Sequence, residues 1–403
     1  MSPPWTNWVG NQSFSPREVV VVVDHSQVQE QVARAAATGH RVRTVGTGHS
    51  FTPIVETDIL LDTAAMRGIS DVDRERRLVS AGPKTTIRDF GEPLWQRGLA
   101  LANQGDIDTQ AIAGAIATAT HGSGRQFGSF SSVLAGARLV DGEGNLVEVS
   151  STSNPEVLAA LQTSIGLLGI MTEVTVSVVP AYELHAHTDV MPFEEMIERF
   201  ETDVEYFRHY GFFWMPTATS ARFYNLEGAG ANDCVVKRYR EVPVGTAREG
   251  LGPHQRVGRA YEIYPMIYSP NFHEVEYFLP IENAKEILRS MRELMLQWLP
   301  LSLYPLEIRV VGHEGAWMSP NYQRDNLVVS ISGEPGKDYW PYLRACDALF
   351  AEFDGRPHWG KLHFMTAERV AGLFPRYDDF VALRRRLDPG GIFLNDHLGA
   401  LFA

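Results

Sequence analysis

Short apolar runs alternate with amphipathic stretches along the first 180 residues. Apolar positions at helical spacing predict helices over residues 27–38, ending near Gly39, and over 86–97 and 156–164. Strands are predicted at 42–45, 59–61, 78–80 and 172–179. Asp141-Gly142 favours a tight turn between strands 133–140 and 146–149. This mixture predicts an α+β domain.

The pattern changes near Pro180. From about Tyr182 aromatic residues become dense, and a long amphipathic helix is predicted over 284–298. We therefore predict a first domain over 1–180 and a second α+β domain over 181–375. Asp388-Pro389-Gly390-Gly391 is a sharp turn signal. We expect the closing segment, 376–403, to dock back on the first domain.

Length and composition agree with a two-domain enzyme. A chain of 403 residues is too long for one ordinary core, and 44% hydrophobic with 21% charged residues is an ordinary globular composition. No apolar run approaches the roughly 20 residues of a membrane span, and residues 1–12 lack a signal-peptide pattern. Cys234 and Cys346 are the only cysteines, which excludes a disulfide framework and a cysteine-rich metal site. We expect a cytoplasmic protein.

The net charge of −13 argues against a nucleic-acid surface, because phosphate binding needs clustered Lys and Arg. The one dense basic run, Arg384-Arg385-Arg386, is interpreted as the solvated face of a helix.

Three segments rich in glycine and small residues carry the candidate chemistry. The first, Gly46-Thr47-Gly48-His49-Ser50, follows a predicted strand, and its backbone N–H groups could hold a pyrophosphate. It is not the GxGxxG dinucleotide fingerprint. The second, 103–124, fits either a channel for an extended ligand or a closely packed small-residue helix with a glycine-rich loop. The third is 166–172.

In this order and spacing, the three segments resemble the FAD-binding domain of the vanillyl-alcohol oxidase (p-cresol methylhydroxylase) family. The resemblance implies FAD as the cofactor and a two-domain flavoprotein. It also implies that His49 carries the flavin covalently through its 8α-methyl carbon, although a turn histidine that only hydrogen-bonds is the alternative. The cofactor-binding residues implied are Gly46, Thr47, Gly48, His49, Ser50, Gly105, Asp106, Gly114, Thr118, His121, Gly122, Gly169 and Ile170.

The C-terminal half is similar to the aldonolactone oxidase branch of that family, through Glu307-Ile308-Arg309 and His358-Trp359-Gly360-Lys361. The resemblance implies that Glu307, Arg309 and Lys361 contact the substrate. Glu307 and Arg309 lie two residues apart and so share one face of a strand. A fixed cation would also stabilise the anionic reduced flavin. His358 and His363 are interpreted as supporting or packing groups, not as the base.

Two positions depart from the branch. Ala111 stands where alditol oxidases have serine, which removes a hydroxyl from the substrate site, and His397 stands where tyrosine is common. The resemblance therefore implies an FAD-dependent oxidase of an aldono-1,4-lactone, of the L-gulono- or D-arabinono-lactone type. An oxidase of an alditol or another primary alcohol (a polyol, cyclitol, nucleoside or oligosaccharide), or a dehydrogenase that uses an acceptor other than oxygen, is the alternative.

Molecular oxygen is expected as the acceptor, because Gly105 aligns with the oxidases at a position beside the flavin. A flavin-binding protein without turnover is disfavoured by Glu307, Arg309 and Lys361 together. A metal hydrolase is disfavoured because no H-E-x-x-H or similar ligand set is present, so no metal is expected.

Overall fold

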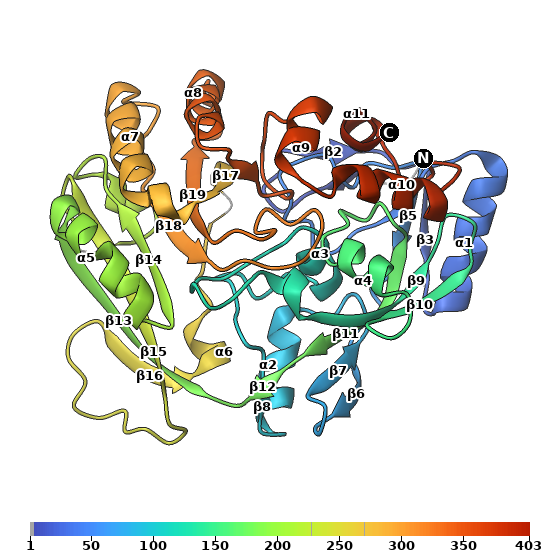
Figure 1. The fold of residues 1–403 in the computed structure, drawn as a ribbon, viewed down its shortest axis with the longest axis horizontal. Helices are drawn as coiled ribbons and strands as arrows, with labels where there is room; N and C mark the ends of the chain where they lie inside the picture. Colours follow the sequence, from blue (N-terminus) through green and yellow to red (C-terminus); the bar gives the residue numbers. More distant parts are fainter. Residues whose placement is uncertain (1–3, 227, 270) are drawn as a thin grey trace.

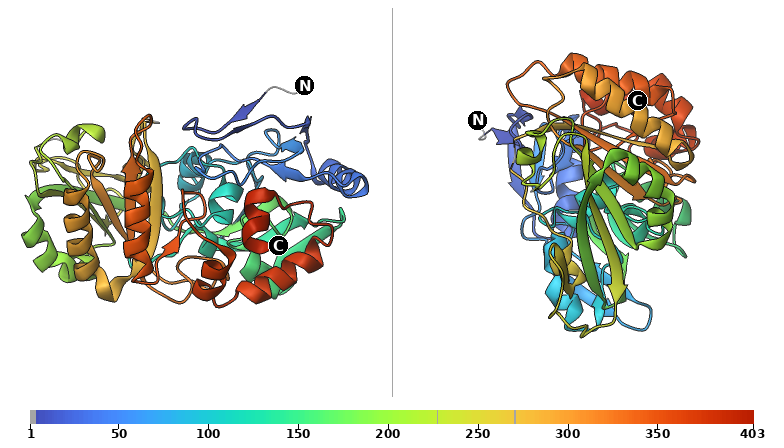
Figure 2. Two further views of the ribbon diagram at one scale, coloured as in Figure 1. Left: turned by 90° about the horizontal axis from the view of Figure 1, so that it is seen from above. Right: turned by 90° about the vertical axis from the view of Figure 1, so that its left-hand side faces the viewer.

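A computed structural model describes residues 4–226, 228–269 and 271–403 of the chain. Two lobes lie side by side in it (Figure 1). The first lobe holds most of the N-terminal half together with the C-terminal helices, so the first described strand and the last helix both belong to it (Figure 2). The second is built on one large sheet. The predicted α+β class with two domains is confirmed.

The first lobe contains two main sheets. A parallel sheet has the order β3 (Glu18–Val21), β5 (Ile59–Asp62), β4 (Val42–Thr44). An antiparallel sheet has the order β10 (Leu146–Ser150), β9 (Leu134–Val140), β11 (Ile170–Ser177), β7 (Leu78–Ala81), β6 (Ile69–Asp73). Two short pairs complete it, β1 (Trp5–Thr6) with β2 (Ser13–Phe14) and β8 (Leu99–Ala100) with β12 (Val179–Pro180). Its helices are α1 (His25–Thr38), α2 (Ile87–Trp95), α3 (Ile112–Ala117) and α4 (Pro155–Leu161).

Most predicted elements of this lobe are confirmed, with ends that shift by a few residues. Helix α1 ends at Gly39, whose φ of 66° suits glycine, and its start is capped by Asp24, which accepts from the Gln27 N–H. The strand predicted at 172–179 begins earlier, at Ile170, and is interrupted at Val178 between β11 and β12. Strand β6 was not predicted, because its residues are half-buried or exposed and show no apolar face.

The second lobe is organised around an eight-stranded antiparallel sheet. Its order is β16 (Gln255–Arg259), β13 (Glu183–Pro192), β15 (Asp233–Val242), β14 (His209–Trp214), β18 (Leu306–Val311), β19 (Asn326–Gly333), β17 (His273–Pro280), β20 (Arg356–Pro357). Helices α5 (Phe193–Tyr206), α7 (Ala284–Gln297) and α8 (Trp340–Ala351) lie along one face of it (Figure 1), and α6 (Ala260–Ile263) follows β16.

Alternation along the central strands divides this sheet into two faces. Leu306, Ile308 and Val310 of β18 join the hydrophobic core beneath the helices. The equivalent positions of β17 and β19, Val275, Tyr277, Val329 and Ile331, join the same core. The intervening residues point the other way, toward the first lobe, so the opposite face is free to carry polar side chains.

The last segment comprises α9 (Ala367–Leu373), α10 (Tyr377–Leu387) and α11 (Asp396–Phe402). It contacts the first lobe: Ile392 O accepts from Val42 N at 2.9 Å, and the Asn395 amide donates to Pro53 O at 2.8 Å. The domain limits at 180 and 375 stay a prediction. The interpretation of Arg384 as part of a solvated face is wrong, since its side chain is buried.

Candidate active site

A large cavity separates the two lobes. It holds about 1630 Å³ of empty space, part of it open to solvent. The glycine-rich turn of residues 46–50 lines one end, and the polar face of the second sheet lines the other. Gly105, Asp106, Gly114, Thr118, His121, Gly169, Ile170, Glu307, Arg309 and Lys361 also line it, whereas Gly122 does not. Gly122 borders a smaller void behind Arg309.

The turn end of the cavity suits an anionic group. None of the backbone N–H groups of residues 46–50 donates a hydrogen bond within the described part of the chain, and Gly48 has a φ of +73°. Lys84 donates to the carbonyls of Val45 and Gly46 at 3.0 and 2.7 Å. Among the described residues, neither Lys84 nor the buried Arg43 has a carboxylate partner. Free N–H donors and two cations without a contacting carboxylate fit the diphosphate of a dinucleotide such as FAD.

His49 lies at the same end of the cavity. Its Nδ1 is 2.9 Å from the Thr47 hydroxyl, its Nε2 is 3.4 Å from the Thr109 hydroxyl, and its ring stacks on Trp8. Burial, together with the charge of Lys361, lowers the pKa of His49 to about 4. The imidazole is therefore neutral at physiological pH.

Both interpretations of the segment 103–124 are partly met. It contains the short helix α3, and its glycines have different roles. An added Cβ at Gly114 would meet nothing within 4 Å, so this position opens on the cavity. A Cβ at Gly105 would lie 2.8 Å from the His121 carbonyl oxygen, and one at Gly122 would lie 2.2 Å from the Gln104 carbonyl oxygen. Close backbone packing explains those two glycines.

Strand register arranges the polar side chains at the other end in rows. Glu307 of β18 is paired with Ser330 of β19, which is paired with Glu276 of β17. In the next row Gly211 of β14 lies between Lys237 of β15 and Arg309 of β18. The prediction that Glu307 and Arg309 share one face of a strand is confirmed.

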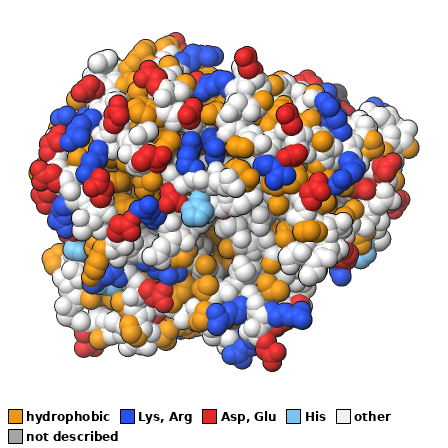
Figure 3. Space-filling view, viewed as in Figure 1, with side chains coloured by type: hydrophobic (Ala, Val, Ile, Leu, Met, Phe, Trp, Pro, Cys, Tyr) orange, Lys and Arg blue, Asp and Glu red, His pale blue; other side chains and the backbone are white. Residues whose placement is uncertain are grey.

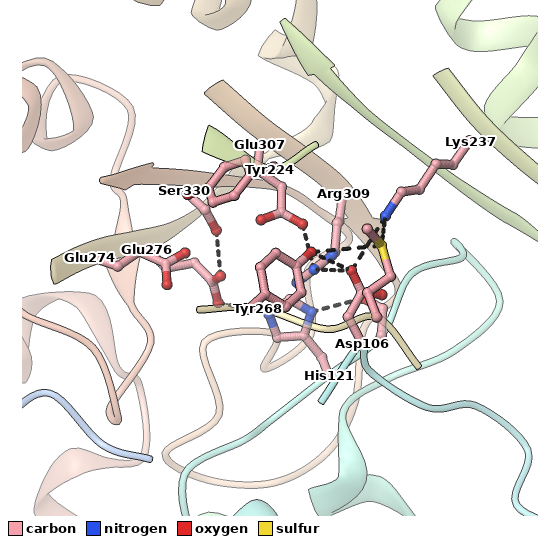
Figure 4. A network of polar contacts seen from close by, with 12 residues as sticks. Asp106, His121, Tyr224, Lys237, Tyr268, Glu274, Glu276, Glu307, Arg309 and Ser330 are labelled. Atoms are coloured by element: carbon pink, nitrogen blue, oxygen red, sulfur yellow. Dashed lines mark hydrogen bonds and ion pairs between the residues drawn. The ribbon is translucent and has the colours of Figure 1, made fainter. Parts of the chain in front are cut away.

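Asp106 is the carboxylate on which the second row converges. Its Oδ2 accepts from the Tyr268 hydroxyl at 2.8 Å and from Arg309 at 3.1 Å, and it lies 3.4 Å from Lys237 Nζ (Figure 4). Burial opposes its ionisation, but Lys237 and Arg309 outweigh burial and bring the pKa of Asp106 to about 2. Asp106 was predicted as a cofactor-binding residue. That role stays a prediction; the Asp106 side chain joins the first lobe to the second sheet.

The negative charge of Glu307 is less well compensated than that of Asp106. Its Oε1 contacts the Arg309 guanidinium, which it shares with Asp106. Burial raises the pKa of Glu307 to about 7, and the Asp106 charge adds to the rise although Arg309 opposes it. This carboxyl group therefore changes protonation near neutral pH.

Lys361 and Glu276 complete the polar face. Lys361 Nζ contacts Glu274 and lies 4.9 Å from the Phe51 ring centre. Glu276 accepts from Ser330 and lies 2.8 Å from His121 Nε2. Burial opposes its ionisation, but His121, His358 and Lys361 hold the pKa of Glu276 well below its usual range.

His121, Glu276 and His358 place three potential metal-ligand atoms within 4.8 Å of one another. However, His358 Nδ1 accepts from the Gly360 N–H at 3.0 Å. Burial lowers the pKa of His358 to about 3, so its ring is neutral and its one proton is on Nε2. That nitrogen has no lone pair for a metal. It is a hydrogen-bond donor at the cavity wall.

Sequence reasoning missed several cavity residues: Lys84, Tyr224, Tyr268, Glu274 and Glu276, together with Lys237 beside Asp106. The alternation of acidic and apolar residues at 273–278 was a usable signal for the two glutamates. No local pattern marks the others. His363 and His397 do not line the cavity. Their rings are 5.4 Å apart, and the Nε2 atom of each is buried without a hydrogen-bond partner in the described chain.

The chain matches known proteins over nearly its whole length. L-gulono-1,4-lactone dehydrogenase of Mycobacterium tuberculosis is 33% identical, over 98% of this chain and 98% of that protein. Alditol oxidase of a Streptomyces species is 27% identical, over 99% of both chains. L-gulonolactone oxidase of Bos taurus is 26% identical, over 98% and 97%.

The fold is similar to that of cholesterol oxidase from B. sterolicum, with a TM-score of 0.83 at 15% identity over 99% of this chain and 96% of that one. A family model described as an FAD binding domain matches residues 16–150, and one described as D-arabinono-1,4-lactone oxidase matches residues 174–233 and 231–401. The chain therefore belongs to the D-arabinono-1,4-lactone oxidase family, the aldonolactone oxidase branch of FAD-dependent oxidoreductases acting on CH–OH groups.

Proposed function

We propose that this protein oxidises a ring hydroxyl of an aldono-1,4-lactone of the L-gulono or D-arabinono type. The observation that carries the proposal is the cavity itself. One end of the cavity offers free backbone N–H donors to a dinucleotide, and at the other end Glu307, Arg309 and Lys361 face the same space. When bound, FAD supplies a hydride acceptor.

The chain's own residues have separate roles in this proposal. Glu307 accepts a hydrogen bond and then the proton from the reacting hydroxyl, for which a pKa of about 7 is suitable. Arg309 orients that hydroxyl and Glu307 together. Lys361 provides a second cation beside the reacting atoms, with Glu274 fixing its position. These three are the proposed catalytic residues.

Substrate class is tested with a panel of aldonolactones and alditols, by following anaerobic bleaching of the flavin absorbance. We expect lactones to react faster. Ala111 lines the cavity without a hydroxyl, which disfavours the alditol alternative. Faster bleaching by alditols would reassign the substrate class to that of the alditol oxidase relative.

We further propose that FAD is bound covalently through His49. A neutral imidazole nitrogen is the nucleophile such a bond needs, and the low pKa of His49 keeps one available. Acid-precipitated protein should retain its yellow colour, and His49→Ala should release it. A colourless wild-type pellet would leave FAD binding intact but exclude the covalent bond.

Molecular oxygen is the proposed acceptor. Relatives of the chain are named both as oxidases and as a dehydrogenase. Gly105 gives oxygen only weak support as the acceptor, because close packing against the His121 carbonyl oxygen already explains the glycine. The test therefore uses the wild-type enzyme, reduced by substrate and then mixed with air. Fast reoxidation with stoichiometric peroxide supports oxygen, and reoxidation over many minutes would exclude it.

No partner beyond these small molecules is proposed. Acidic and basic side chains are interspersed on the face seen in Figure 3, without a large basic area for nucleic acid. None of the described helices has the length and apolar character needed to cross a bilayer.

A further inference from the structure

The charged groups at the sheet end of the cavity balance one another. Arg309 and Lys237 lie against Glu307 and Asp106, and Lys361 lies against Glu274. His121 faces Glu276. The buried groups thus form charge-neutral sets, provided that the last pair is neutral.

Hydrogen bonding shows that the His121–Glu276 pair has no net charge. His121 Nδ1 is 2.8 Å from the Gly122 carbonyl oxygen, which can only accept, so Nδ1 carries a hydrogen. Its Nε2 is 2.8 Å from a Glu276 oxygen, and a hydrogen must lie between them. Whether that proton belongs to the ring or to the carboxyl, the pair as a whole has no net charge.

A balanced buried site has a consequence for the chemistry. Oxidation of an alcohol breaks a C–H bond, whose electron pair leaves as hydride to the flavin, and an O–H bond, whose proton must go to a base. The reduced cofactor then carries one added negative charge. In a buried site an uncompensated charge is costly. A proton retained beside the cofactor restores neutrality, and a proton lost to solvent does not.

One carboxylate is best placed to retain it. Both oxygens of Glu276 are engaged, by His121 and Ser330, and Asp106 Oδ2 is surrounded by three donors. Glu274 is in direct contact with Lys361. The only cation in direct contact with Glu307 among the described residues is Arg309, which Asp106 also contacts, and no group of the described chain donates to Glu307 Oε2.

We propose that Glu307 becomes protonated on Oε2 whenever the cofactor is reduced, and that it keeps the proton of the substrate hydroxyl until the electrons leave. This inference rests on the proposed function for the origin of the proton. With oxygen as acceptor, the hydride, the retained proton and O₂ together give H₂O₂, so atoms and electrons balance without exchange with solvent.

The surroundings of Glu307 fix the pH range in which this holds. The titratable and charged groups that influence it come from several elements: Arg309 on β18, Asp106 after β8, Lys237 on β15, Glu274 on β17, Lys361 after β20, and Tyr224 and Tyr268 in the segments before β17. Burial raises the pKa of both tyrosines well above its ordinary value, so they stay neutral. Burial and the neighbouring carboxylates bring the pKa of Glu307 to about 7. Above that pH Glu307 is ionised at rest and can take up a proton.

The test is the pH dependence of the flavin midpoint potential, measured on the substrate-free holoenzyme at pH 7.5 to 9. Two-electron reduction that also protonates Glu307 takes up two protons, so the potential should fall by about 60 mV per pH unit. Reduction that protonates only the flavin takes up one proton and gives about 30 mV. A wild-type slope near 30 mV would overturn the proposal.

Two variants locate the second proton. Glu307→Gln cannot ionise and should give the smaller slope, of about 30 mV per pH unit, whereas Glu183→Gln, at a buried carboxylate that does not line the cavity, should keep about 60 mV. A slope near 60 mV in Glu307→Gln would assign the proton to the flavin or to another group and overturn the role of Glu307. Because no substrate is used, failure of the lactone panel leaves this result unaffected, and the reverse also holds.

Discussion

Single residues in this site act through shared partners. Arg309 Nη2 contacts Glu307 and Asp106 at once, so neither carboxylate has a full positive charge to itself. Because the cation is shared, the other partners of each carboxylate decide its pKa, and the pKa values of Glu307 and Asp106 differ widely. Asp106 has Lys237 and Tyr268 as well and has a pKa of about 2, whereas Glu307 lacks such partners and has a pKa of about 7.

Removing the shared cation should disable the site. Arg309→Ala should lower the rate of anaerobic flavin reduction by roughly a hundredfold or more, because one preorganised charge contact is lost. Lys361→Ala should act in the same direction, since Glu274 loses its cation. Stopped-flow reduction with a reactive lactone is the measurement, with flavin content determined for each variant. Arg76→Ala, at a side chain that is 80% exposed, is the control. A flavin-loaded Arg309→Ala enzyme with the wild-type rate would contradict the assigned role.

The predictability of the site differs from residue to residue. Glu307 and Arg309 could be assigned to one face because strand alternation is local. The meeting of Arg309 and Lys237 at Asp106 could not be predicted. Asp106 is 203 positions from Arg309 and lies outside the second sheet, whereas Lys237, 72 positions from Arg309, is brought near it by the strand order of that sheet. Asp106 was therefore assigned to the cofactor, while Lys237 and Tyr268 were missed.

At the scale of elements, the eight-stranded sheet separates stability from chemistry. On β17, β18 and β19, one set of alternate residues packs in the core beneath the helices. The other set includes the cavity-lining Glu274, Glu276, Glu307 and Arg309, and a small apolar cluster of Phe278, Val311 and Val328. In this lobe the sequence predicted a strand at Glu307 and Arg309, but not that β14 pairs with β18 or that β19 lies between β18 and β17. Antiparallel pairing between distant segments leaves no local pattern to read.

Strand β14 provides a test of this arrangement that changes no cavity-lining residue. Gly211 lies between Lys237 and Arg309, and an added Cβ would be 2.8 Å from the Ile308 carbonyl oxygen. Gly211→Ala should therefore push β18 away. We expect a lower rate of flavin reduction and a loss of about 1–3 kcal/mol of stability from overpacking. Gly315→Ala, where a Cβ meets nothing within 4 Å, should change neither quantity. Equal behaviour of the two variants in rate and urea unfolding would show that Gly211 does not set the spacing.

At the scale of the molecule, the two lobes contribute different chemistry to one cavity. The first supplies unpaired N–H groups and the cations Arg43 and Lys84, and the second supplies most of the paired charges. Asp106 connects the two lobes by binding the segment around Tyr268 in two ways. The Asp106 side chain accepts from the Tyr268 hydroxyl, and the Asp106 carbonyl oxygen accepts from Met266 N at 2.9 Å. The proposed substrate and cofactor sites are therefore linked by the same residue.

The buried histidines should make the whole fold sensitive to acid. Burial lowers the pKa of His209, His358 and His363 from the ordinary 6.5 to about 3. The unfolded chain binds protons at these groups from about pH 6.5 downward and the folded chain does not, so stability falls as pH drops through that window, by up to about 1.4 kcal/mol per pH unit for each group. Glu307 has the opposite sign, because its raised pKa lets the folded state bind a proton first, and burial raises the pKa of Glu314 and Asp388 as well. The histidines outnumber these carboxyls, since burial also lowers the pKa of His49, His273 and His397. The free energy of unfolding, measured with urea, should be markedly lower at pH 5.5 than at pH 7.5.

Two variants test the contribution of one histidine. His363→Leu, which removes a ring whose Nε2 has no partner in the described chain, should reduce that loss of stability, and His25→Ala at an exposed position should not. An unchanged pH dependence in His363→Leu would mean that this histidine is protonated in the folded protein.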